Sequence, residues 1–240
     1  MLYRVLFYVF GLLLISFGVA FSVNSNLGVS PVNSFPYAIS AVTGIWTLGV
    51  WVNIIFCAYI LVQVLVLRKD FKMKNLLQIV FSVLFGRFVD FAKWVVGDFA
   101  MPAYAGQLAM MAISIVLIAF GLIFYLTPDI VPLPMEGMAL AFTTKLKKYK
   151  FHNVKIVCDC VSVALAVLVT LLGMLLRPEA SIAWGVREGT VLSALLAGRM
   201  MAVFGKFLKP WVQRACFGPA VQPSVPVNLP IVPKPQPRPP

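Results

Sequence analysis

Two arginines lie inside long apolar stretches of the sequence, where a charged side chain is costly. Arg87 and Arg199 each follow a glycine in such a stretch, and burying an arginine at the centre of a membrane helix costs about 2.5–3.5 kcal/mol or more. Asp90 lies three residues after Arg87, on the same face of a helix, whereas Arg199 has Ala202 at the matching place. Two interpretations stay open: a buried salt-bridge network that sets helix register, or contact with an anionic solute.

Three acids in apolar surroundings are candidates for proton coupling or charge pairing. They are Asp90, Glu136 and Asp159. Carboxyl groups in a poorly hydrated interior can exchange protons near neutral pH. Glu136, Asp159 or a bound anion is also a candidate partner for Arg199, which lacks an acid on its own helix.

Two short segments begin with proline, the residue favoured at the first position of a helix. They cover residues 31–43 and 134–148, and each is too short to cross a membrane comfortably. A helix that starts inside the bilayer leaves about four N–H groups without partners, and these favour negative charge. We expect Ser30 to cap the first segment. Either segment could instead lie flat in the interface. The candidate substrate-binding residues are Arg87, Arg199, Ser30, Asn33 and Glu136.

The composition defines the class of protein that must position these residues. Of the 240 residues 61% are apolar and 12% are charged, and no charged residue or histidine lies between Arg4 and Arg68. A helix needs only about 20 apolar residues to span a bilayer, so we expect an all-α, polytopic membrane protein. The net charge of +12 sits in short clusters beside apolar runs, which excludes a nucleic-acid-binding stripe. The expected spans are 4–23, 47–67, 76–96, 105–127, 153–176 and 187–208.

An internal repeat divides the chain into two halves, 1–104 and 105–208. Ser16–Phe21 is similar to Ala119–Phe124, and the same alignment without a gap places Pro31 on Pro134 and Asn33 on Glu136. Leu84–Arg87 likewise matches Leu196–Arg199. The first helix has a counterpart in the second half, so we interpret it as an uncleaved span rather than a signal peptide.

The basic residues predict the topology. Lysines and arginines cluster at 68–75 and 145–155, and both clusters reach the cytoplasmic side only if the short helices do not cross. This predicts six spans with both termini in the cytoplasm. Three spans in each half make the two repeats inverted relative to each other, an architecture typical of transporters.

The remaining features carry less chemistry. Residues 209–240 are predicted to form a disordered cytoplasmic tail, whose proline-rich part 218–240 could bind a partner or have none. Cys158 and Cys160 with His152 fall short of a metal site, which needs about four ligands. With one histidine and no catalytic motif, we expect no enzyme, cofactor or metal.

Three short motifs resemble the YczE/YitT-like family of bacterial integral membrane proteins. They are Gly28–Pro31, Gly185–Thr190 and Leu196–Arg199, and the resemblance covers about residues 4–208. It implies a location in the bacterial plasma membrane and no defined activity. Members of that family usually carry an acidic residue shortly after the first proline, and this sequence has Asn33 in its place.

We therefore expect a secondary transporter or channel for a small anionic or zwitterionic solute bound near the bilayer midplane. The alternative is a non-catalytic accessory or scaffolding protein that stabilises a partner complex. A protein of either kind would lie in the lipid bilayer and could form a homo-oligomer there.

Overall fold

A computed structural model describes residues 2–71, 73–146, 149, 151–179 and 182–217. All regular structure in these residues is helical. The α-helices are α1 (Leu2–Asn24), α2 (Pro31–Thr43), α3 (Leu48–Leu67), α4 (Leu77–Val96), α5 (Tyr104–Leu126), α6 (Pro134–Leu146), α7 (Phe151–Leu176) and α8 (Glu188–Phe217), with short 3-10 turns η1 (Arg68–Asp70) and η2 (Met73–Leu76) between α3 and α4.

Within the described ranges, five helices are long and apolar enough to cross a membrane: α1, α3, α5, α7 and α8. This confirms the all-α, multi-pass class. The 20-residue helix α4 has sufficient length but carries Arg87, Asp90 and Lys93, so its composition alone does not mark it as a span. The expected count of six spans therefore stays a prediction.

Most helix bounds follow the sequence expectation, and one end departs from it. The short helix α2 covers the predicted residues 31–43. Helix α8 continues to Phe217, past the predicted end at 208 and through Pro210, so the expected disordered tail does not begin at 209. The aromatic contacts of Trp211 with Phe7 and of Phe217 with Arg4 hold this extension against α1. The proline-rich segment 218–240 lies outside the described residues.

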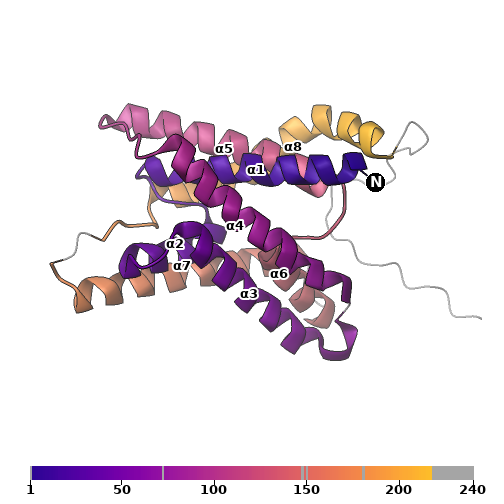
Figure 1. The fold of residues 1–240 in the computed structure, drawn as a ribbon, viewed down its shortest axis with the longest axis horizontal. Coiled ribbons are helices and arrows are strands. Elements are labelled where there is room, and N and C mark those ends of the chain that lie inside the picture. The colour runs from indigo at the N-terminus through magenta and orange to yellow at the C-terminus, as the bar shows by residue number, and fades with distance from the viewer. Residues whose placement is uncertain (1, 72, 147–148, 150, 180–181, 218–240) are drawn as a thin grey trace, which may run out of the picture.

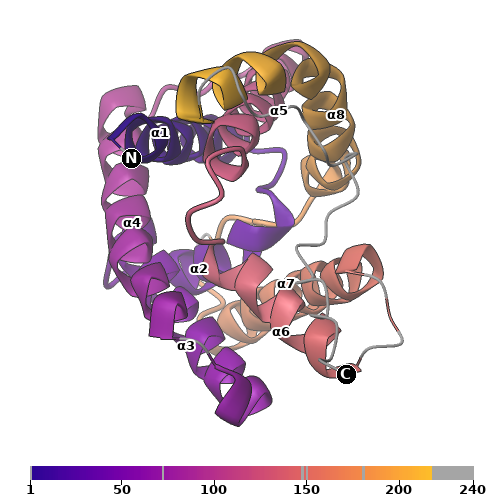
Figure 2. The same ribbon diagram turned by 90° about the vertical axis from the view of Figure 1, so that its right-hand side faces the viewer.

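Helices α1 and α5, the first helices of the two sequence halves, pack along each other at the centre of one group of helices. Helix α4 covers the other side of α1, and α8 covers the other side of α5 (Figure 1). A second group contains α3, α6 and α7, with α2 packed against α7 and α3. Figure 2 shows this second group below the first, joined to it through the contact between α3 and α4.

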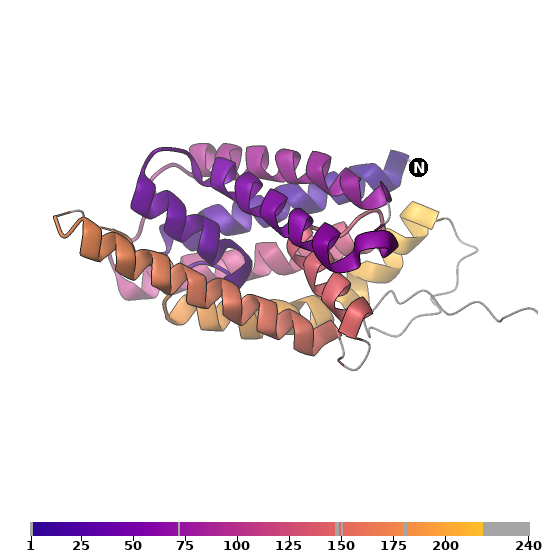
Figure 3. The ribbon, with the colours of Figure 1, turned by 90° about the horizontal axis from the view of Figure 1, so that it is seen from below.

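The two short helices approach from opposite ends of α1. At the N-terminal end, Arg4 donates to the carbonyl of Pro128 at 2.6 Å and Tyr8 donates to the carbonyl of Val131 at 2.9 Å, which fixes the loop that leads into α6. At the other end, Ser22 donates to the carbonyl of Gly28 at 2.9 Å, in the loop that leads into α2. The separation of the short helices along the molecule is visible in Figures 1 and 3.

The close packing of α1 on α5 depends on two glycines that face each other. A Cβ atom added at Gly11 would lie 2.5 Å from the backbone nitrogen of Tyr125 and 2.8 Å from the carbonyl oxygen of Gly121. A Cβ atom at Gly121 would in turn lie 2.8 Å from the carbonyl oxygen of Gly11. Backbone atoms cannot move aside as a flexible side chain can, so the two helices need glycine here to keep this distance.

Gly11→Ala is therefore expected to destabilise the protein by about 1–3 kcal/mol, the usual cost of overpacking. The thermal unfolding midpoint of the full chain in detergent measures this loss. Gly205→Ala is the matched control, because a Cβ atom at Gly205 in α8 meets no atom of the described structure within 4 Å. Equal midpoints for the two variants would contradict the packing of α1 on α5.

Candidate functional site

The start of α2 is held by a local polar network. The side chain of Ser30 does not cap a backbone N–H as the sequence predicted. Its Oγ instead accepts a hydrogen bond from Nδ2 of Asn33 at 3.1 Å, while the backbone N–H of Asn33 donates to the carbonyl of Ser30 at 2.9 Å. Ser34 donates to the carbonyl of Pro31 at 2.8 Å. Ser30 and Asn33, both predicted site residues, are thus in direct contact.

Asn33 leaves one strong hydrogen-bonding atom unused. Its side chain is 3% exposed, and among the described residues Oδ1 has no hydrogen-bond partner. A buried carbonyl oxygen without a partner costs about 1–3 kcal/mol, and such a cost is typical of a position that meets a water molecule or a ligand. Oδ1 can accept a hydrogen bond from a hydroxyl, an ammonium group or water.

The start of α6 is closed by protein groups instead. Glu136 lies in the first turn and accepts a hydrogen bond from the hydroxyl of Tyr125 at 2.6 Å and from the backbone N–H of Leu133 at 3.2 Å. The Leu133 N–H also donates to the Tyr125 hydroxyl. Since Gly137 N–H bonds to the carbonyl of Leu133, Glu136 occupies the position from which an acid reaches back to the helix start. Its side chain is half-buried.

Two buried glutamines support the same helix start and were not predicted. Gln63 on α3 and Gln78 on α4 exchange side-chain hydrogen bonds of 2.9 and 3.2 Å. Gln63 also donates to the carbonyl of Pro134 at 3.0 Å. Gly137 lets the amides approach, because a Cβ atom there would lie 2.7 Å from Oε1 of Gln63. One glutamine in each of two predicted spans was the sequence signal for this pair.

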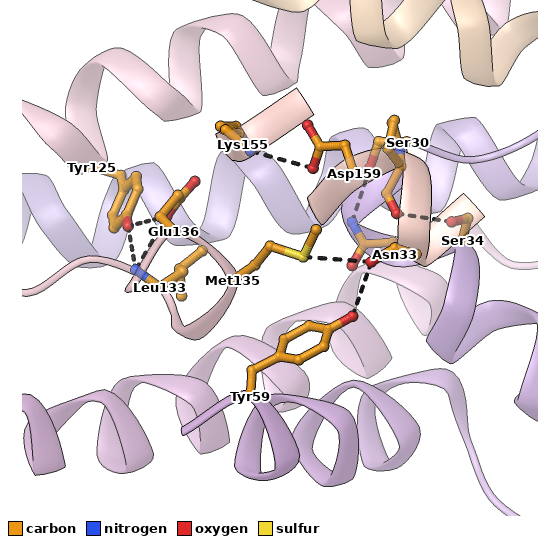
Figure 4. Close-up of polar contacts among 12 residues, drawn as sticks. Ser30, Asn33, Ser34, Tyr59, Tyr125, Leu133, Met135, Glu136, Lys155 and Asp159 are labelled. Carbon is orange, nitrogen blue, oxygen red and sulfur yellow. Dashed lines mark hydrogen bonds and ion pairs between the residues drawn. The ribbon is translucent and has the colours of Figure 1, made fainter. Parts of the chain in front are cut away.

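A third polar contact links α3, α7 and α6 between these two helix starts. The hydroxyls of Tyr59 and Ser162 lie 3.1 Å apart, and Ser162 contacts Sδ of Met135 at 3.7 Å. All three side chains are buried. Figure 4 draws this contact with the residues of both helix starts. Tyr59 and Ser162 were also missed, although polar side chains inside apolar spans are uncommon enough to mark them. We call Ser30, Asn33, Tyr59, Glu136 and Ser162 the interior polar cluster.

The other two candidate acids have structural partners. Asp159 forms an ion pair with Lys155 at 3.5 Å on α7. Asp90 does not pair with Arg87; its carboxylate accepts from the Gly49 N–H and from the Thr47 hydroxyl, both at 2.8 Å. Asp90 therefore stabilises the start of α3, where the helix dipole favours an acid. Glu136 is the one predicted proton-coupling residue that belongs to the interior polar cluster.

The two arginines predicted as site residues are not part of the interior polar cluster. Arg87 on α4 and Arg199 on α8 are both exposed. The ion pairs of the described residues join Lys93 to Asp98, Lys155 to Asp159 and Arg187 to Glu188, so neither arginine takes part in one. Both arginines lie near the middle of their helices, as the sequence predicted, and their contact with a solute stays a prediction.

The loop before α2 is tied to the loop before α8. Val29 N–H donates to the carbonyl of Gly185 at 2.9 Å, and Gly189 N–H donates to the carbonyl of Leu27 at 2.8 Å. Gly28, at φ 105°, has a conformation that side-chain-bearing residues rarely adopt. A hollow of about 10 Å³ lies between these loops, lined by Ser22, Gly28, Tyr37, Trp184 and Gly185 among others. This volume holds about one water molecule.

Metal chemistry has no support in the part of the chain that the structure describes, which contains no group of three or more His, Cys, Asp or Glu placed to hold an ion. The arrangement is suited to binding rather than to metal chemistry. Helix starts and buried hydroxyl, amide and carboxyl groups offer both donors and acceptors to a small polar molecule.

The fold and this polar interior define a multi-pass helical membrane protein. The chain belongs to a family of unknown function, DUF6198, whose model matches residues 2–206. It is 29% identical over 140 residues to the uncharacterized membrane protein YczE of Bacillus subtilis (strain 168), an alignment that covers 58% of this chain and 62% of that protein. These matches confirm the YczE-like resemblance. No solved structure matches the chain.

Removal of the Glu136 side chain is expected to destabilise α6 more than its conversion to an amide. Glutamine keeps an oxygen that accepts from Leu133 N–H, whereas alanine leaves this contact empty. We expect Glu136→Ala to cost about 1 kcal/mol and Glu136→Gln clearly less, as measured by thermal unfolding of the full chain in detergent. Glu179→Ala, at an exposed site, is the control. A Gln variant as unstable as the Ala variant would contradict this role.

Proposed function

We propose that this protein is a secondary transporter or channel for a small anionic or zwitterionic solute, which binds at the interior polar cluster. The observation that carries the proposal is the buried Oδ1 atom of Asn33, which has no hydrogen-bond partner among the described residues. It lies in the first turn of a short helix, where backbone N–H groups favour negative charge. A zwitterion supplies both an ammonium donor for Oδ1 and a carboxylate for the helix start.

The proposed topology has six spans, with α4 as the sixth, and two short re-entrant helices. The approach of α2 and α6 from opposite ends of α1 supports inverted repeats, because each half then enters the membrane from its own side. The basic segments 68–75 and 145–155 support cytoplasmic termini. The family resemblance supports a bacterial plasma membrane.

In this proposal the two helix starts have different roles. The start of α6 is satisfied by Glu136, Tyr125 and Gln63, so it acts as the fixed side of the site, and Glu136 is the residue that exchanges a proton if transport is coupled. The start of α2 has the atom that needs a partner. The solute site therefore centres on Asn33 and Ser30 rather than on Arg87 and Arg199.

A second candidate function is an accessory protein that stabilises a membrane complex, with a second copy of the chain or another protein as partner. The observation that favours it is the exposure of Arg87 and Arg199 in the middle of apolar helices, because a charge facing hydrocarbon is costly. The segment 218–240 would offer a further contact. Co-purification of full-length and truncated chains distinguishes the two functions: the accessory function predicts partners that are lost with residues 218–240.

Solute flux into proteoliposomes tests the transport proposal. Vesicles with the purified full chain are mixed with hyperosmotic glycine, taurine, phosphate or lactate, and swelling after the initial shrinkage is followed by light scattering. We expect at least one solute to enter faster than into protein-free vesicles. Asn33→Leu should slow this entry about tenfold or more, since a hydrogen bond to a charged group contributes about 1.5–3 kcal/mol.

Asn53→Leu is the matched control, because Asn53 on α3 also has a buried Oδ1 atom without a partner among the described residues but packs against Gly86, outside the interior polar cluster. Its transport rate should stay near that of the unaltered chain. Entry of none of the four solutes, or equal entry with the Asn33 and Asn53 variants, would contradict the proposal.

A further inference from the structure

A hollow lies at the end of the molecule that carries the basic loops, between the last turns of α3 and α6. Its volume is about 350 Å³, and it is lined by Leu65, Val66, Arg68, Phe142, Lys145 and Leu146. The two helices that line it, α3 and α6, pack against each other. The hollow is distinct from the interior polar cluster, which lies at the opposite end of α6.

The lining combines two cations with an apolar wall. Arg68 follows the last residue of α3, and Lys145 lies in the last turn of α6, so a positive charge comes from each side of the hollow. Both side chains are exposed, and neither takes part in an ion pair formed by the described residues. The other four lining residues are aliphatic or aromatic.

We propose that this hollow binds one anionic phospholipid. A basic pocket between membrane helices is suited to the phosphate of a lipid headgroup, and arginine can donate two parallel hydrogen bonds to such a phosphate. Leu65, Val66, Phe142 and Leu146 then contact the upper acyl chains. A free phosphate ion would use the two cations but would gain nothing from four apolar residues.

The chain's own proline-rich segment is a poor occupant. Residues 218–240 include Lys234 and Arg238 and contain no aspartate or glutamate, so Arg68 and Lys145 would repel rather than attract them. Asp70 lies two residues after Arg68 but is exposed, and its single negative charge leaves the hollow and its rim positive. Charge complementarity therefore favours a negatively charged lipid.

Native mass spectrometry of the full chain in detergent tests the site. Dioleoylphosphatidylglycerol is the anionic probe and dioleoylphosphatidylcholine the zwitterionic one. We expect the first phosphatidylglycerol to bind at least about tenfold more tightly than phosphatidylcholine. The double variant Arg68→Gln/Lys145→Gln should remove most of this preference, because each basic residue near a lipid surface contributes about a factor of five.

The matched control is Lys69→Gln/Lys74→Gln, which removes the same charge from exposed residues of the neighbouring loop that do not line the hollow. It should keep the preference for phosphatidylglycerol. Equal loss in both double variants would overturn the proposal in favour of general surface charge. Displacement of bound phosphatidylglycerol by millimolar inorganic phosphate would overturn it in favour of a free anion.

Discussion

Backbone N–H groups at the start of a buried helix have no water to bind, and the packing around α2 and α6 meets that constraint in two ways. The short helices α2 and α6 both begin among buried side chains. At α6 the protein supplies the partners: the Leu133 N–H meets Glu136 and Tyr125, and the carbonyl of Pro134 accepts from Gln63. Tyr125 and Gln63 come from two other helices, α5 and α3, so both must be packed in place before this helix start is satisfied.

The start of α2 solves the same problem with fewer groups. Ser30 and Asn33 bond mainly to each other, and no acid comparable to Glu136 takes part. In the alignment of the two halves, Asn33 takes the place of Glu136. The two halves therefore differ at the residue that caps the second short helix. Because of this difference, the buried Oδ1 atom of Asn33 at the start of α2 has no hydrogen-bond partner among the described residues, whereas Glu136 at the start of α6 has no such buried atom. The proposed solute site is therefore asymmetric.

Sequence patterns predicted the helices well because each apolar run has a clear length and clear ends. The proline at each short helix defined its first residue, and α2 matches its predicted range fully. The direction in which side chains point was not predictable in the same way. Helices α4 and α8 are apolar around most of their circumference, so spacing alone does not say which face packs inward. The exposure of Arg87 and Arg199 was therefore not predictable from their spacing.

Partners that are distant in sequence were also hidden. The i, i+3 spacing suggested that Asp90 serves Arg87, but Thr47 and Gly49 on another helix take its carboxylate. The pairing of Gln63 with Gln78 and of Tyr59 with Ser162 depends on how α3 meets α4 and α7, which no local pattern records. A polar residue in an apolar span is a candidate for a buried hydrogen bond, but its partner depends on how the helices pack.

The proposed transport function requires that α2 and α6 turn back inside the membrane from opposite faces. Cysteine labelling from each side of intact vesicles measures this directly, after replacement of the four native cysteines, with single variants at the exposed positions Asn26, Ile45, Asp129 and Tyr149. We predict that Asn26→Cys and Ile45→Cys react from one face, and that Asp129→Cys and Tyr149→Cys both react from the other. If the two members of either pair react from opposite faces, that short helix crosses the bilayer, which would contradict the proposed topology.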